Sequence, residues 1–96
     1  MKKLLQNIIQ YRDERGWRDH DTPEALAKSI IIEAAELLEN YQWPDQIPNE
    51  ENVKEELADV LIYALAMASD LGYDPETIIL EKMVKNNKKY PKLENK

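Results

Sequence analysis

Two pairs of carboxylates lie at helical spacing inside apolar stretches of this chain. Glu33 and Glu36 interrupt the run SIIIEAAELLENYQW, and Glu56 and Asp59 interrupt KEELADVLIYALAMASDLG. Residues three apart in a helix share one face, with Cβ atoms about 5–6 Å apart. Carboxylates are rarely buried without a partner, and the sequence offers no evident buried base. The pattern therefore favours a divalent cation held by oxygen ligands, and with it metal-dependent chemistry on a charged substrate.

The residues around these acids indicate where they lie. Each pair belongs to a narrow helical stripe, and the two stripes are Ser29, Glu33, Glu36 and Asn40, and Asn52, Glu56, Asp59 and Tyr63. The other positions are almost all apolar, whereas an ordinary surface helix has a broad polar face. We therefore expect the acids to line a cavity between helices. The alternative is a solvated charged edge on a helical bundle. Glu39 and Glu55 lie off the stripes and are expected to be solvated or to form salt bridges.

Length and composition limit the class of protein. A chain of 96 residues predicts a single domain spanning 1–96. Two helices that are apolar on several faces exceed what so short a chain can cover, so we expect a homo-oligomer, a dimer or a tetramer. The absence of cysteine excludes disulfides and thiolate metal sites. The first sixteen residues are too polar for a signal peptide, and the apolar run 60–68 is too short to span a membrane. A cytoplasmic location with no membrane partner is expected.

The charge is unevenly distributed. The net charge of −6 argues against binding a nucleic-acid polymer, because such binding depends on Lys and Arg neutralising phosphates. Residues 81–96, EKMVKNNKKYPKLENK, are nevertheless rich in lysine. This segment could contact a small polyphosphate opposite a metal, or it could be a solvated helix end where the dipole favours cations. The sequence leaves both interpretations open.

Start and stop signals predict four helices and no strands, at about residues 2–15, 23–41, 50–71 and 75–89. The expected N-caps are Thr22, Asn49 and Asp74, of which the first and third precede a proline. Gly16 and Gly72 are expected to end the first and third helices. The segment QWPDQIPN is a loop, and residues 93–96 are expected to fray. The fold class is therefore all-α, a four-helix bundle completed by oligomerisation.

Aromatic residues and one histidine complete the candidate set. Trp17 and Trp43 lie in the loops on either side of the second helix, where they either cover the core or stack together on a planar base. Tyr63 lies one turn beyond Asp59 and is either a core tyrosine or part of the site. Di-iron bundles use Glu-x-x-His on two helices. His20, the only histidine, cannot supply that set, so hard cations such as Mg²⁺ or Mn²⁺ are favoured.

Several motifs occur in order along residues 17–91. They read DTPEALAKSIIIEAAELLENYQW with EAAE at 33–36, EELADVLIYALAMA with ELAD at 56–59, and KMVKNNKKYP at 82–91. This ordered set resembles the MazG-like all-α nucleoside triphosphate pyrophosphohydrolases, including the dCTP pyrophosphatase branch. Members of that family often carry His directly before the Thr-Pro. Here Asp21 takes that position and His20 comes one residue earlier, so no base-contacting role is transferred to His20, and base selectivity is expected to differ.

The resemblance implies an enzyme that hydrolyses (deoxy)nucleoside triphosphates to the monophosphate and pyrophosphate, for removal of non-canonical or pyrimidine deoxynucleotides. By resemblance the catalytic, Mg²⁺-binding residues are Glu33, Glu36, Glu56 and Asp59, with Mn²⁺ as a possible substitute, and the nucleotide-binding residues are Trp17, Trp43, Tyr63, Lys82, Asn86 and Lys89. The rival interpretations are a non-catalytic helical interaction module and a nucleotide-binding regulator with a degenerate site. An interaction module would have solvated, replaceable acids and no response to metals.

Overall fold

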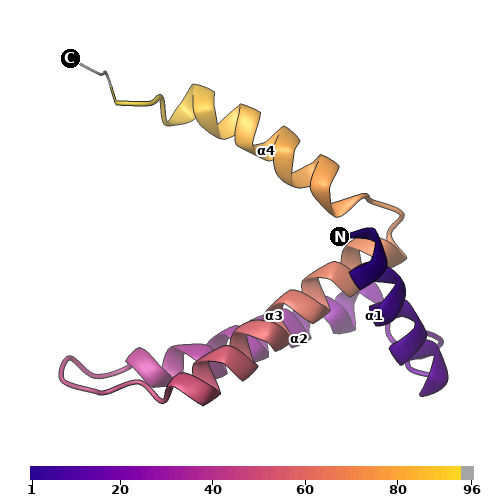
Figure 1. The fold of residues 1–96 in the computed structure, drawn as a ribbon, viewed down its shortest axis with the longest axis horizontal. Helices are drawn as coiled ribbons and strands as arrows, with labels where there is room; N and C mark the ends of the chain where they lie inside the picture. Colours follow the sequence, from indigo (N-terminus) through magenta and orange to yellow (C-terminus); the bar gives the residue numbers. More distant parts are fainter. Residues whose placement is uncertain (94–96) are drawn as a thin grey trace.

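The computed structural model describes residues 1–93 and contains only helices in that range (Figure 1). The elements are α1 (Lys2–Glu14), α2 (Pro23–Leu38), the 3₁₀ helix η1 (Glu39–Tyr41), α3 (Glu50–Asp70) and α4 (Pro75–Lys89). The predicted all-α class with four helices is confirmed, and the last turn of the predicted second helix is the 3₁₀ helix. The fraying expected for 94–96 falls outside the described residues. None of the helices within 1–93 is long and apolar enough to cross a membrane.

The helix ends follow local side-chain chemistry. The side chain of each N-cap accepts a hydrogen bond from the backbone N–H three residues later. The acceptors are Thr22 Oγ1 for α2 (3.1 Å from Ala25 N), Asn49 Oδ1 for α3 (3.0 Å from Asn52 N) and Asp74 Oδ2 for α4 (3.0 Å from Thr77 N). Each bond satisfies one of the N–H groups that a helix start leaves without a partner. Gly16 and Gly72 follow α1 and α3 with φ of 68° and 79°, which glycine adopts without a Cβ clash. These boundaries agree with the sequence prediction.

The helices α2 and α3 form an antiparallel hairpin that is closed by the loop after η1 (Figure 1). Asn40, which is only 5% exposed, donates to Asn52 Oδ1 at 2.8 Å. Its own Oδ1 accepts from the backbone N–H of Asn49 at 3.1 Å. These bonds join the two polar stripes at one end, so that Asn40 and Asn52 pair with each other rather than line a cavity. The pairing fixes how α3 lies along α2.

The core of a single chain is small. Ile8 of α1, Leu26 of α2 and Ala66 of α3 are buried together, and Tyr63 packs against them. This cluster fixes α1 against the α2–α3 hairpin. Because so few residues fill the core, most large apolar side chains lie at the surface of the isolated chain.

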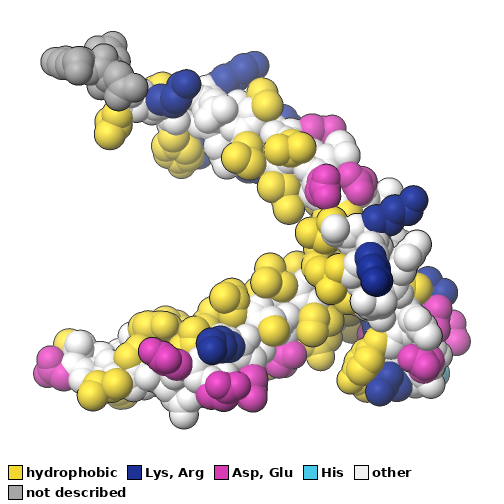
Figure 2. All heavy atoms as spheres, in the orientation of Figure 1, with side chains coloured by type: hydrophobic (Ala, Val, Ile, Leu, Met, Phe, Trp, Pro, Cys, Tyr) yellow, Lys and Arg dark blue, Asp and Glu magenta, His cyan; other side chains and the backbone are white. Residues whose placement is uncertain are grey.

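The helix α4 diverges from the α2–α3 hairpin (Figure 1). Apolar side chains lie on both arms and face each other across the opening (Figure 2). The exposed apolar side chains of α4 include Ile79, Leu80, Met83 and Val84, which are 53–59% exposed; those of α2 and α3 include Ile31, Ile32, Leu57 and Leu61, which are 47–69% exposed. A single chain therefore presents four helices without closing them into a bundle.

Candidate active site

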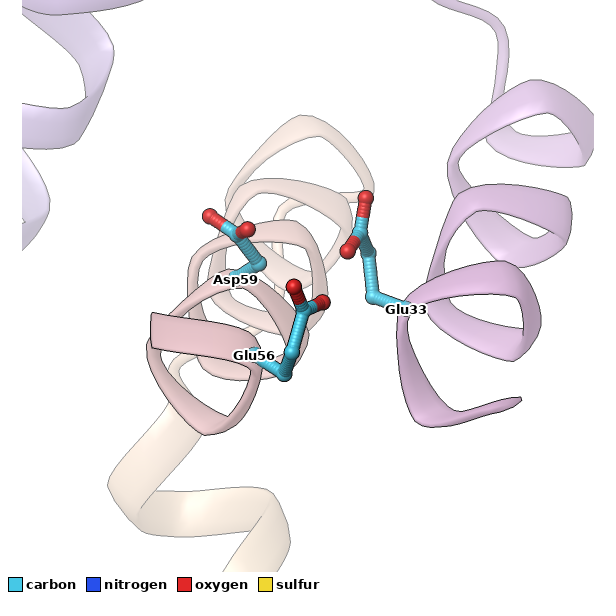
Figure 3. A group of neighbouring side chains, drawn as sticks. All are labelled: Glu33, Glu56 and Asp59. Carbon is cyan, nitrogen blue, oxygen red and sulfur yellow. The ribbon is translucent and has the colours of Figure 1, made fainter. Parts of the chain in front are cut away.

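Carboxylates from α2 and α3 meet between the two helices. Glu33, Glu56 and Asp59 each offer an oxygen atom, and these oxygens all lie within 4.8 Å of one another. The three side chains point toward one another from facing helices (Figure 3). The helical spacing predicted from the sequence places Glu56 and Asp59 on one face of α3. The antiparallel packing of α2 then brings Glu33 opposite them.

Glu36 belongs to the same group of acids. It lies one turn beyond Glu33 on α2, is partly buried, and lies close enough to Glu33 and Glu56 to raise the pKa of both. The structure therefore brings all four predicted acids together, and we refer to Glu33, Glu36, Glu56 and Asp59 as the acid centre. Glu39 and Glu55 are exposed, as expected.

The acid centre is electrostatically strained as it stands. Glu33 and Glu56 each have one Oε2 atom that is buried and has no hydrogen-bond partner. Hydrogen bonds with Glu33 and then Glu36, together with burial, raise the pKa of Glu56 from 4.5 to about 7. The hydrogen bond with Glu56 lowers the pKa of Glu33, but burial and Glu36 outweigh it and the net pKa is raised. Protonation therefore relieves a repulsion that a cation would relieve more completely.

The chemistry of these ligands fits a hard divalent cation. Four carboxylates provide only oxygen atoms, which Mg²⁺ and Mn²⁺ prefer, and the site has no sulfur ligand because the chain has no cysteine. Two buried oxygens without donors are the expected feature of a site that binds a cation rather than a neutral ligand.

A cavity of about 390 Å³ begins at Asp59 and extends between α1 and α3. Its walls are mainly apolar and aromatic, and they include Tyr11, Trp17, Ile62 and Tyr63. A volume of this size is within the range of small-molecule sites, which are commonly apolar with a few polar groups. The acid centre therefore opens directly onto space for an organic group.

Tyr63 lines the cavity together with Asp59 of the acid centre. Burial raises the pKa of Tyr63, and the charges of Glu33, Asp59 and Asp21 raise it further. The tyrosine therefore experiences both the acid centre and Asp21, which lines the same cavity. This arrangement shows that the cavity connects the two groups, with the tyrosine ring along its side.

Trp17 is held at the cavity by its neighbours. Its ring meets the ring of Tyr11 edge-on, with centroids 5.6 Å apart. The guanidinium of Arg15 lies 3.6 Å from the centroid of Tyr11 and 5.8 Å from that of Trp17. Cation–π contacts of this kind restrict the rings further. These contacts hold one side of the indole at the cavity, while 47% of Trp17 stays exposed.

Other predicted nucleotide contacts lie elsewhere. Trp43 is in the loop at the opposite end of the hairpin from α1, is 67% exposed, and does not line the cavity (Figure 1). A base sandwiched between Trp17 and Trp43 therefore cannot form within one chain. Lys82, Asn86 and Lys89 recur at i, i+4 and i+7 on one face of α4, and none of them lines the cavity.

Arg12 is the main residue that the sequence interpretation missed. It is 3% exposed, lines the cavity and binds Asp70 through Nη1 at 3.0 Å and Nη2 at 2.8 Å. Nη2 also lies 3.6 Å from Asp21 Oδ2. The chain therefore has a buried base, contrary to the sequence interpretation, but its partners are not the acid centre. The signal was present, because Arg12 follows Ile8 by four residues on the apolar stripe of α1.

The fold and the acid centre define an all-α protein with a carboxylate site between two antiparallel helices. Comparison with known protein families identifies its family, because the model of the MazG-like family matches residues 28–96. The chain belongs to the MazG-like family.

Individual proteins resemble it as well. The chain is 33% identical to dCTP pyrophosphatase 1 of Bos taurus and to that of Homo sapiens, over 85% of this chain and 54% of each relative. It thus spans about half the length of these mammalian proteins. The crystal structure of a pyrophosphatase from Archaeoglobus fulgidus superposes with a TM-score of 0.84 at 42% identity, covering 96% of this chain and 93% of that one.

Proposed function

We propose that this chain is a nucleoside triphosphate pyrophosphohydrolase that releases pyrophosphate and a nucleoside monophosphate. The observation that carries the proposal is the acid centre, with its two buried oxygens that lack donors, opening on a cavity suited to a nucleoside. The names of the mammalian relatives and of the Archaeoglobus protein support the same activity. We propose that the chain, as a single domain over residues 1–96, removes non-canonical or pyrimidine deoxynucleotides in the cytoplasm.

The acid centre would hold Mg²⁺, or Mn²⁺ in its place. When bound, such a cation neutralises triphosphate oxygens and lowers the pKa of a coordinated water. The chain itself positions the nucleotide. Trp17 offers a fixed aromatic face for the base, and Tyr63 lines the passage between the acid centre and the cavity. The triphosphate is thereby placed at the acid centre and the base in the cavity.

We also propose that the protein works as a homo-oligomer. The chain exposes 8089 Å², whereas a compact monomer of 11.3 kDa exposes about 5,700 Å². Its radius of gyration is 16.6 Å, against about 12.5 Å for a compact chain of this length. The excess of roughly 2,400 Å² is more than the ~800 Å² per partner in a standard interface. A second copy covering the apolar faces of α4 and the hairpin would account for this excess.

In an oligomer, the predicted nucleotide-binding residues that lie away from the cavity of their own chain could contact nucleotide bound to another copy. Lys82, Asn86 and Lys89 share one face of α4, close beside its apolar stripe. If α4 packs on another copy, this face can approach that copy's acid centre and contact the phosphates of the nucleotide. Trp43, which is exposed on the hairpin loop, is likewise proposed to contact nucleotide across subunits.

Sedimentation or light scattering of the purified chain is expected to give a mass of at least two copies. Val84→Glu places a charge in the apolar stripe of α4 and should shift the protein toward monomer. Glu14→Lys, at the exposed end of α1 and outside the apolar stripe of α4, is the control and should leave the mass unchanged. A wild-type chain that is monomeric at micromolar concentration would contradict the proposed oligomer.

Pyrophosphate release from a panel of canonical and modified nucleoside triphosphates tests the activity. We expect release with Mg²⁺, a matching monophosphate as the other product, and none with a chelator. Identification of the monophosphate distinguishes this reaction from stepwise release of phosphate. If no triphosphate is hydrolysed, the acid centre needs another explanation and the interaction-module interpretation becomes the leading one.

A further inference from the structure

We propose that Asp21 selects the base, by accepting a hydrogen bond from an exocyclic amino group such as the 4-amino group of cytosine. The inference rests on the proposed function, because it assumes that the cavity holds the base of a nucleoside triphosphate. It adds a specificity-determining residue that lies in the loop before α2, outside the region 28–96 matched by the family model.

Asp21 is held firmly where it lines the cavity. Its backbone N–H donates to Trp17 O at 2.8 Å, and the next residue, Thr22, caps α2. The side chain is partly buried and reaches the cavity wall. The same turn fixes Trp17, so the aromatic face and the carboxylate keep one position relative to each other.

The carboxylate of Asp21 has unused capacity to accept hydrogen bonds. Within residues 1–93 its side-chain partner is Arg12, with Nη2 3.6 Å from Oδ2, which is an ion pair rather than a short hydrogen bond. Arg12 directs its two shorter bonds to Asp70 of α3. Arg12 is therefore a positioning residue: it neutralises and orients Asp21 while the lone pairs of Asp21 stay available for a ligand.

Asp21 is a carboxylate of the cavity wall that does not belong to the acid centre. The other carboxylate that lines the cavity, Asp59, belongs to the acid centre. Asn7 also lines the cavity, but an amide offers both a donor and an acceptor and so does not distinguish an amino group from a carbonyl. A carboxylate accepts only. With the triphosphate at the acid centre, we place the edge of the base against this acceptor, which lines the same cavity.

Cytosine and uracil differ where this acceptor would meet them. Cytosine carries an amino group on C4, which carboxylates recognise as a donor, whereas uracil carries a carbonyl oxygen there. Placing that oxygen against Asp21 sets two acceptors together in a partly buried position, with no donor between them. Sites built around such a hydrogen bond reject analogues that lack it far more strongly than apolar pockets reject a change in size.

The test is the ratio of kcat/KM for dCTP to kcat/KM for dUTP, measured with Mg²⁺. We expect wild type to prefer dCTP, and Asp21→Asn to lower the ratio roughly ten- to hundredfold, because its amide can turn a donor toward the uracil carbonyl. Asp19→Asn removes the same charge from an exposed position in the same loop, away from the cavity, and should keep the wild-type ratio.

Asp21→Ala is a second variant, which removes the acceptor without supplying a donor. It should lower turnover of dCTP and raise that of dUTP, because the uracil carbonyl no longer faces a carboxylate. Thermal melts establish that each variant is folded. A folded Asp21→Asn protein with the wild-type ratio, or a wild type that does not distinguish the two nucleotides, overturns the role of Asp21 but leaves the proposed function intact. Absence of turnover for every triphosphate overturns both.

Discussion

Replacing Glu56 with Gln is expected to lower pyrophosphate release by at least about a hundredfold while leaving the protein folded. Glu56 contributes one of three oxygens that lie within 4.8 Å of one another, and its Oε2 is buried without a donor. Glutamine has nearly the same shape but offers one oxygen and no charge. The variant should therefore lose cation affinity, and turnover with it, without losing packing.

The same substitution should raise the melting temperature of the metal-free protein above about pH 7. Glutamine removes one charge from a centre of four acids, and its amide can donate to Glu33, whose oxygen otherwise has no partner. Glu55→Gln is the matched control, because it makes the same change at the neighbouring, exposed position of α3 and should behave as wild type. Near-normal turnover in Glu56→Gln would remove Glu56 from the proposed site.

Millimolar Mg²⁺ is expected to stabilise the protein, and to stabilise it more as the pH rises. A cation at a hundredfold excess over its Kd should raise the melting temperature by roughly 10–20 °C for a domain of this size. Protons compete with the cation at Glu56, whose pKa is raised from 4.5 to about 7. Below about pH 7 the cation must displace a proton, so its stabilising effect is smaller.

Without a cation, the titration of Glu56 should make the fold less stable as the pH rises. Because the folded state raises the pKa of Glu56, it binds the proton more tightly than the unfolded chain does. The resulting stabilisation is complete below about pH 4.5 and is lost as the pH rises through about 7. Melts with chelator and with Mg²⁺ at about pH 6 and about pH 8.5 give both effects. An equal shift at the two pH values, or none, would contradict cation binding at the acid centre.

The local features of the fold could be predicted from the sequence because they depend on residues close in the chain. Thr22, Asn49 and Asp74 cap helices as expected, and Gly16 and Gly72 end them. The acid centre also followed from periodicity, since two motifs on consecutive helices meet once the helices pair as a hairpin. In each case the sequence separation is short and the geometry of a helix supplies the rest.

Features that depend on distant residues could not be predicted in this way. Arg12 and Asp70 are 58 positions apart, and nothing local to either indicates the other. Asn40 and Asn52 shared the acidic stripes, yet they pair with each other at the end of the hairpin. The divergence of α4 from the hairpin could not be predicted from its sequence either. An amphipathic helix has the same pattern whether it packs on its own chain or on another copy.

The acid centre and the wall around Asp21 come from different parts of the chain. Residues 33–59, a single helical hairpin, supply every carboxylate of the acid centre, whereas α1 and the loop before α2 supply Arg12, Trp17 and Asp21. The two parts meet through the Arg12–Asp70 pair and a small apolar cluster. If the proposed function holds, substrate range is therefore open to redesign within the first twenty-two residues, and an engineered library confined to that segment would leave the carboxylates of the acid centre unchanged.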